Sequence, residues 1–76
     1  MEIILTDGSG NAKEDHEIYV RLKGGGGTNG KTNSNGVYKT GLKGTHTVEK
    51  ITCYGRTLHN YDLVVNSNTT IELEFR

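Results

Sequence analysis

Residues 25–37 read Gly-Gly-Gly-Thr-Asn-Gly-Lys-Thr-Asn-Ser-Asn-Gly-Val, and this stretch decides between two very different folds. Residues 25–32 satisfy the phosphate-binding pattern G-x-x-x-x-G-K-[ST] at every required position. That pattern binds phosphate only where a helix begins directly after the Lys and Thr, because the free N–H groups of the helix N-terminus hold the anion. Here Asn33-Ser34-Asn35-Gly36 follows, and these residues form helices poorly.

The second half of this stretch instead indicates a turn between strands. Asn35-Gly36 is the strongest short-range hairpin signal, since both residues tolerate the positive φ angles of a type I′ turn. We therefore expect strands over residues 31–34 and 37–40 on either side of it. The chain also has no room for the parallel α/β sheet that usually carries a phosphate-binding loop. Nucleotide binding is not expected, and the glycines preceding Lys31 predict a flexible inter-strand connection.

The rest of the chain shows strand periodicity between turns. Residues 17–23 alternate strictly, with Ile18, Val20 and Leu22 on one face of the expected strand. In residues 45–54 the apolar phase shifts between Val48 and Ile51, which predicts a bulge or bend. Further strands are expected over residues 2–6, 61–65 and 69–75, and residues 55–60 read as a short excursion. The sequence thus predicts about seven strands and no helix, in a small antiparallel, Ig-like β-sandwich.

Composition sets the outer limits. The chain has 76 residues, which is enough for a single domain spanning 1–76. Nine basic residues balance nine acidic ones, so no long-range field draws in nucleic acid, and no stretch is long and apolar enough for a membrane span. No signal peptide is recognisable at the N-terminus. Cys53 is the only cysteine, and a buried small hydrophobe is favoured there over a reactive thiol.

The order of motifs resembles a known family. Asp7-Gly8-Ser9-Gly10 follows the first strand, Lys31–Tyr38 carries T-x-x-x-G-x-Y, and residues 42–48 read Leu-Lys-Gly-Thr-His-Thr-Val. Tyr54-Gly55 and a closing Thr70-Ile71-Glu72-Leu73 complete the series. This order is similar to that of carboxypeptidase regulatory-like domains, which are transthyretin-like (prealbumin-like) β-sandwiches, and to the related Cna-B-type surface domains. The resemblance implies a non-enzymatic accessory domain of secreted, cell-surface or virion proteins.

No pattern in the sequence indicates catalysis, a cofactor or a metal. Asp7, Ser9, Asn11 and Asp15 imitate the start of a calcium loop, but Ala12 stands where Gly is needed and Ile18 where Glu is needed. The three histidines lack ligand spacing; we expect His46 to be part-buried, and His16 and His59 to lie on the surface. No nucleophile and base can be paired from local context. We therefore expect no catalytic, cofactor-binding or metal-binding residues.

Two surfaces are candidates for contact with a partner. The first is the mobile connection formed by Gly24, Gly25, Gly26, Gly27, Thr28, Asn29 and Gly30. The second is an aromatic surface made of Tyr19, Tyr54 and Tyr61, which could stack on sugars. Glu72 and Glu74 alternate with apolar residues in the last strand, so they predict a solvated face that also guards an exposed edge against pairing.

Three functions remain open at this point. The first is a structural or interaction module that docks onto a larger assembly by self-assembly or through a protein partner, such as a phage capsid-decoration or tail protein or a cell-surface accessory domain. The second is a carbohydrate-binding, adhesive module that recognises a glycan. The third is a small inhibitor or regulator that binds another protein through an edge strand. The resemblance implies a location outside the cell or on a virion surface.

Overall fold

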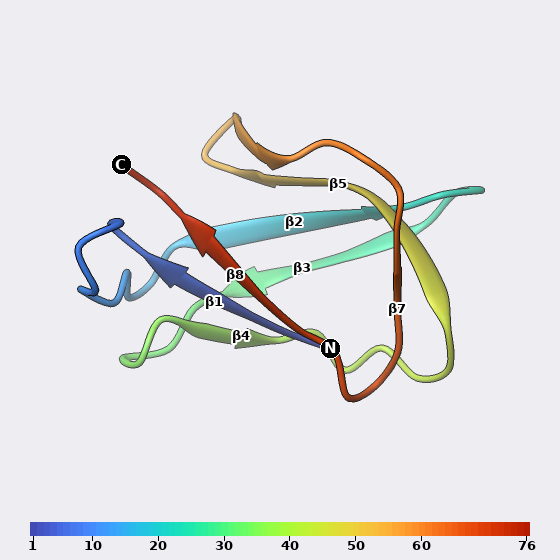
Figure 1. Cartoon of the computed structure of the whole chain (residues 1–76), viewed down its shortest axis with the longest axis horizontal. Coiled ribbons are helices and arrows are strands. Elements are labelled where there is room, and N and C mark those ends of the chain that lie inside the picture. The colour runs from blue at the N-terminus through green and yellow to red at the C-terminus, as the bar shows by residue number, and fades with distance from the viewer.

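A computed structural model describes all 76 residues and contains eight β-strands and no helix. Figure 1 shows the strands in their spatial arrangement. Their bounds are β1 Glu2–Thr6, β2 Glu17–Leu22, β3 Gly27–Lys31, β4 Val37–Lys39, β5 His46–Cys53, β6 Arg56–His59, β7 Leu63–Val65 and β8 Thr70–Glu74. The all-β prediction is confirmed, with one strand more than the seven expected from sequence.

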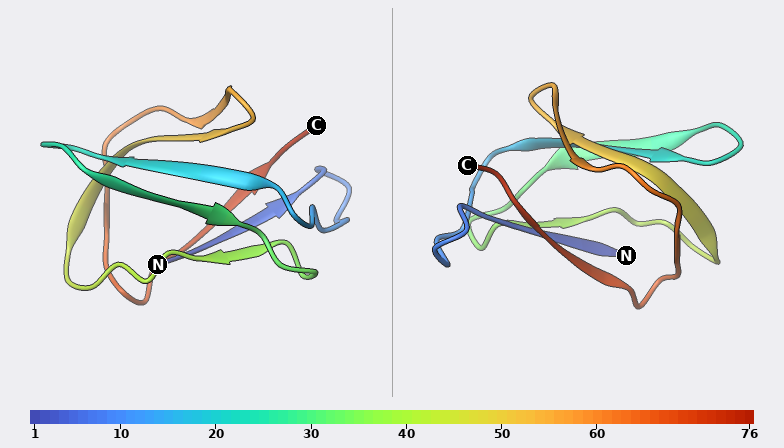
Figure 2. Two further views of the ribbon diagram at one scale, coloured as in Figure 1. Left: turned by 180° about the vertical axis from the view of Figure 1, so that it is seen from behind. Right: turned by 45° about the horizontal axis from the view of Figure 1, so that its top comes forward.

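The strands form two sheets. The smaller one has the order β4-β1-β8, and the larger one has the order β3-β2-β5-β6, with β7 also paired to β5. Figure 2 shows from two further sides how the chain passes between the sheets, which it does after β1, β3, β4 and β7. The larger sheet is wholly antiparallel.

Both sheets contribute to one buried cluster, which explains why a neutral, glycine-rich chain of this size can fold. The larger sheet supplies the alternating residues predicted from sequence, with Ile18 and Val20 at 0% and 3% exposure. Eleven hydrophobic residues are buried: Met1, Ile3, Leu5, Ile18, Val20, Leu22, Tyr38, Val48, Ile51, Cys53 and Val65. Burial raises the pKa of the Cys53 thiol, so this cysteine is the small buried hydrophobe that the sequence predicts.

The first and last strands pair in parallel, which corrects the expectation of a purely antiparallel arrangement. Glu2 lies opposite Thr70 and Thr6 lies opposite Glu74. The reason is where the chain re-enters this sheet: the N-terminal amino group of Met1 donates to the Ser67 carbonyl at 3.2 Å. The turn before β8 therefore delivers the chain beside Met1, so β8 begins where β1 begins and runs in the same direction.

Asn35-Gly36 forms a turn, but the predicted hairpin is wrong. The Gly36 N–H donates to the Asn33 carbonyl at 2.9 Å, and the Asn33 side-chain oxygen accepts bonds from the N–H groups of Asn35 and Val37. The Gly36 carbonyl then accepts from the N–H of Leu5 at 2.7 Å. Because β1 captures the chain there, β4 joins the smaller sheet instead of pairing with β3.

Residues 27–31, expected within and just after a flexible connection, form strand β3. The connection between β2 and β3 is residues 23–26, so only Gly24 to Gly26 of the predicted flexible segment lie outside a strand. Gly30 faces the ring of Tyr38 from the other sheet so closely that a Cβ atom would collide with that ring. The Tyr38 hydroxyl lies 2.8 Å from the Thr28 hydroxyl, within hydrogen-bond distance. Gly30 therefore allows the two sheets to pack closely at this position.

The predicted irregularity in β5 is confirmed as a bulge. Arg21 lies opposite Lys50 and Leu22 lies opposite Val48, so Glu49 is left without a partner across the ladder. The extra residue restores the apolar phase, because Val48 and Ile51 can then both face the core with 0% exposure.

Strand β6 was not expected, and it also makes the predicted exposure of His59 wrong. It begins after a tight turn in which both Tyr54 and Gly55 adopt positive φ angles, of 50° and 77°. Tyr rarely adopts this conformation, so the hairpin has no usual sequence signal. The register skips Leu58, which turns His59 inward at 5% exposure, with its Nε2 2.6 Å from the Tyr61 carbonyl. His16 is half-buried, and His46 is part-buried as expected.

Candidate functional site

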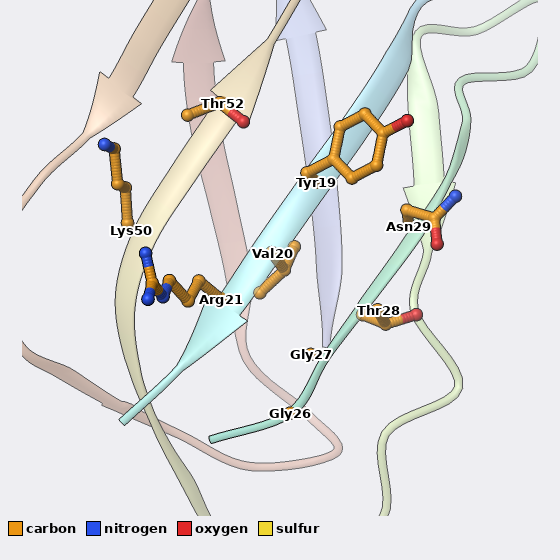
Figure 3. Close-up of a pocket in the computed structure, with 9 residues that line it drawn as sticks. All are labelled: Tyr19, Val20, Arg21, Gly26, Gly27, Thr28, Asn29, Lys50 and Thr52. Atoms are coloured by element: carbon orange, nitrogen blue, oxygen red, sulfur yellow. The ribbon is translucent and has the colours of Figure 1, made fainter. Parts of the chain in front are cut away.

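An open depression of about 450 Å³ lies on the outer face of the larger sheet. We call it the Tyr19 face (Figure 3). It is lined by residues from β2, from β3 and its preceding turn, and from β5: Tyr19, Val20, Arg21, Gly26, Gly27, Thr28, Asn29, Lys50 and Thr52. It combines one end of the predicted glycine-rich connection with one tyrosine of the predicted aromatic surface.

Strand register builds this face. Tyr19 lies directly between Asn29 on β3 and Thr52 on β5, and Arg21 lies between Gly27 and Lys50. Cross-strand partners have Cβ atoms about 5 Å apart, so each of these rows presents adjacent side chains to solvent. Because Gly27 has no side chain, the surface of β3 next to Arg21 is lower than the surface next to Tyr19, where Asn29 projects. The result is an aromatic ring beside polar side chains and bare backbone.

The Tyr19 side chain is half exposed, at 50%. Its hydroxyl donates a hydrogen bond to the Glu17 carboxylate at 3.0 Å. This bond and the negative charge of Glu17 raise the pKa of the Tyr19 phenol. The ring therefore stays neutral and is held by its hydroxyl, with its body free to stack on a planar or sugar-like group.

The two cations of this face differ in their partners. The Arg21 Nε lies 3.1 Å from the carboxylate of Glu49, the bulge residue of β5. Lys50 takes part in none of the five ion pairs of the structure. The Tyr19 face consequently offers one free ammonium group, one partly neutralised guanidinium group, an amide and a hydroxyl.

The free edge of β3 borders this face. The N–H of Leu22 donates to the Gly26 carbonyl, and the N–H of Thr32 donates to the His16 carbonyl. Pairing directions alternate along an antiparallel ladder, so the backbone N–H and C=O groups of Gly27, Asn29 and Lys31 point away from β2. No strand pairs with that side of β3. The edge therefore carries unpaired backbone donors and acceptors, with Asn29 at its centre.

Tyr54 and Tyr61 are exposed as expected, at 59% and 67%, but each lies in a different environment from Tyr19. The Tyr54 ring contacts His16 and Phe75, with centroid separations of 5.2 and 5.9 Å. The Tyr61 ring contacts the His59 ring in a tilted arrangement, with centroids 4.1 Å apart. No aromatic contact joins any two of the three tyrosines, so their rings do not form one continuous cluster.

The Lys and Thr of the phosphate-like pattern are engaged elsewhere. Lys31 ends β3, with its ammonium 3.8 Å from the Asp15 carboxylate. Thr32 is buried, and its hydroxyl donates to the Lys13 carbonyl at 2.5 Å while accepting from the His16 N–H at 3.0 Å. A strand and a turn thus stand where a phosphate site needs a helix, and the threonine fixes the loop before β2.

The residues that imitated a calcium loop form a self-contained turn. The Asp7 carboxylate accepts bonds from the N–H groups of Ser9 and Asn11 and from the Asn11 side-chain amide. These bonds, led by that of the Asn11 side chain, lower the pKa of Asp7. The carboxylate oxygens therefore stabilise their own turn. No cluster of three metal-ligating side chains occurs in the structure.

Sequence reasoning found Tyr19 and the glycine-rich side of the Tyr19 face but missed Arg21, Lys50 and Thr52. Their alternation marks them as outward-facing, yet only the register between β2 and β5 brings them together.

No family model, no curated protein and no solved structure matches the chain. No helix of the structure has the length and apolar character needed to cross a bilayer.

Proposed function

We propose that this protein is a non-enzymatic structural and interaction module that joins a larger assembly by extending its β3 edge. The observation that carries the proposal is the row of unpaired backbone groups on Gly27, Asn29 and Lys31. A row of this kind is a ready template for a further strand. In our proposal the two sheets form a β-sandwich of the carboxypeptidase regulatory-like, transthyretin-like type, as the motif order of the sequence favours.

A second copy of the chain fits this edge. In an antiparallel pair centred on Asn29, that residue meets its own counterpart, and Gly27 meets Lys31 of the other copy. No like charges oppose each other across this pair, and amide side chains form favourable ladders. Such a role suits a component of a virion or of a cell surface, where identical domains are displayed side by side.

An Asn29→Pro variant tests this proposal. The Asn29 N–H faces the free edge, so proline removes a donor needed for assembly without removing a bond of the β2–β3 ladder. Sedimentation equilibrium at millimolar concentration should show dimers or larger species for the wild type and monomers for the variant. Amide exchange at Gly27, Asn29 and Lys31 should slow on association. A monomeric wild type with fast exchange at all three positions would contradict self-assembly through β3.

Carbohydrate binding is a second candidate, favoured by the half-exposed Tyr19 ring beside Arg21, Asn29, Lys50 and Thr52. Sugars stack on such rings while hydrogen-bonding groups fix their orientation. A glycan array with the wild type, followed by titration of any hit, measures this directly. Tyr19→Ala should abolish binding, whereas Tyr54→Ala and Tyr61→Ala are matched controls, because those rings lie in other environments. The absence of binding to any glycan on a broad array would exclude this second function.

A further inference from the structure

Strand β8 leaves one of its two edges unpaired, because it contacts only β1 within its sheet. The N–H of Glu2 donates to the Thr69 carbonyl, and the N–H of Phe75 donates to the Thr6 carbonyl. The alternation along this parallel ladder turns the backbone groups of Thr70, Glu72 and Glu74 toward the free side. β8 therefore offers a second row of unpaired donors and acceptors.

The side chains of β8 differ sharply on its two faces. Ile71 and Leu73 pack against the core but are only partly buried, unlike the fully buried Ile3 and Leu5 of the neighbouring β1. In the right-hand view of Figure 2, β8 (red) forms the border of its sheet. Leu58 of β6 and Leu63 of β7 are likewise partly buried. An added strand would cover apolar surface that the chain itself leaves half covered.

The outward face of β8 is acidic. Glu72 takes part in no ion pair, whereas Glu74 is bonded to the Arg76 guanidinium at 2.6 and 3.0 Å. Glu2 stands in the same outward row beside Thr70, with Lys39 at 4.0 Å from its carboxylate. Arg56 lies over the ring of Phe75 at the far end of the strand. Glu72 is therefore the uncompensated charge at the centre of this edge.

This charge pattern disfavours a second copy of β8 as the occupant. In an antiparallel β8–β8 pair centred on Glu72, the two Glu72 carboxylates would stand directly opposite each other, which is unfavourable. A segment with basic residues at the same positions would instead be attracted. Its intervening residues would point toward Ile71 and Leu73, so they must be apolar.

We propose that the free edge of β8 is an acceptor site for an extended segment of another protein in which apolar residues alternate with lysine or arginine. The segment adds a fourth strand to the β4-β1-β8 sheet. Its backbone pairs with Thr70, Glu72 and Glu74, its apolar residues cover Ile71 and Leu73, and its basic residues neutralise Glu72. This site is separate from the β3 edge and does not depend on the function proposed for that edge.

The probe is a fluorescent peptide, Lys-Val-Lys-Val-Lys-Val-Lys, with Glu-Val-Glu-Val-Glu-Val-Glu as the charge-reversed control. Fluorescence anisotropy should show saturable binding of the lysine peptide and no binding of the glutamate peptide. Amide exchange of the full chain should slow at Thr70, Glu72 and Glu74 and stay unchanged at Gly27, Asn29 and Lys31. Protection at β3 only, or no binding of the lysine peptide at millimolar concentration, would overturn the proposal.

Four variants separate the effect of charge from that of backbone pairing. Glu72→Gln should weaken binding of the lysine peptide about fivefold, and Glu74→Gln should weaken it less, because Arg76 already neutralises Glu74. Glu72→Pro removes the central N–H of the free edge and should abolish binding, while Asn29→Pro should leave it unchanged. Equal effects of the two glutamine variants, together with full binding by Glu72→Pro, would refute strand addition at β8. Thermal unfolding of each variant verifies that it is folded.

Discussion

Two of the free edges of this molecule, those of β3 and β8, are built in opposite ways. At β3 the outward positions are Gly27, Asn29 and Lys31, and the inward ones, Thr28 and Gly30, are covered by Tyr38 of the facing sheet. At β8 the outward positions carry carboxylates and the inward ones carry partly buried aliphatic side chains. We propose that an edge with a covered underside and no repelling charge accepts its own copy. In the same proposal, an edge with a half-open apolar underside and a central carboxylate binds a different, basic strand.

Replacing the side chain beneath each edge by alanine should give the largest difference between β3 and β8 in the free energy of unfolding. Tyr38 is 8% exposed and fills the space under β3, so Tyr38→Ala should lower the free energy of unfolding by about 3–5 kcal/mol. Leu73→Ala under β8 should cost only about 1–2 kcal/mol, because Leu73 is partly exposed already. Urea unfolding followed by circular dichroism measures both. Equal losses would mean that β8 is as well covered as β3.

The glycine of β3 gives the next largest effect. Gly30→Ala places a methyl group against the Tyr38 ring, and overpacking of this kind costs about 1–3 kcal/mol. Asn29→Ala, one residue away on the exposed face, is the matched control and should change the free energy of unfolding by less than about 0.5 kcal/mol. If Gly30→Ala changed the free energy of unfolding as little as its control does, the two sheets would not pack closely at β3.

Neutralising β8 should make the two edges alike. The double variant Glu72→Gln, Glu74→Gln removes the like-charge opposition in a β8–β8 pair, which is worth up to about 1 kcal/mol per opposed pair. We expect weak self-association through β8 that the wild type lacks at this edge. Sedimentation equilibrium in an Asn29→Pro background, where β3 is blocked, isolates the effect. Persistent monomers in that background would show that charge is not what keeps β8 from self-pairing.

The smallest expected effect concerns the ion pair that fixes the end of the β2–β3 hairpin. The Lys23 ammonium donates to the Asp62 carboxylate at 2.5 Å, and this bond raises the pKa of Lys23. While Asp62 is ionised, a raised lysine pKa contributes stability below the ordinary lysine value, and this contribution is lost as the pH rises through the folded-state value. Asp62→Asn should bring the Lys23 pKa down toward the ordinary lysine value in an NMR titration. An unchanged titration would show that the pair does not form in solution.

Much of this fold could be predicted from sequence because local periodicity reports burial. The alternation around Ile18 and Val20 predicted β2, and the phase shift between Val48 and Ile51 predicted the bulge that leaves Glu49 unpaired. Both signals depend only on which side of one strand a residue faces. A turn at Asn35-Gly36 was also predicted correctly, but its type I′ geometry was not, because only Gly36 adopts a positive φ, of 74°.

The features that could not be predicted from the sequence depend on contacts between distant segments. The Asn35-Gly36 turn changes sheets because the Leu5 N–H binds the Gly36 carbonyl, a partner far away in the chain. Strand β3 was read as a loop because its core contact is supplied by Tyr38, not by its own residues. The Tyr19 face likewise needed the register between β2 and β5, which no single strand specifies.

The parallel pairing of β1 with β8 also bears on how the domain would respond to mechanical load. The two strands begin side by side near Met1 and run the same way, so Met1 and Arg76 lie toward opposite ends of their shared ladder (Figure 1). A pulling force between these residues therefore acts along the strands. All the hydrogen bonds of the ladder must then slide together, whereas a force across the strands would open them singly. Such a shear geometry slows forced unfolding, a useful property for a domain tethered at both ends.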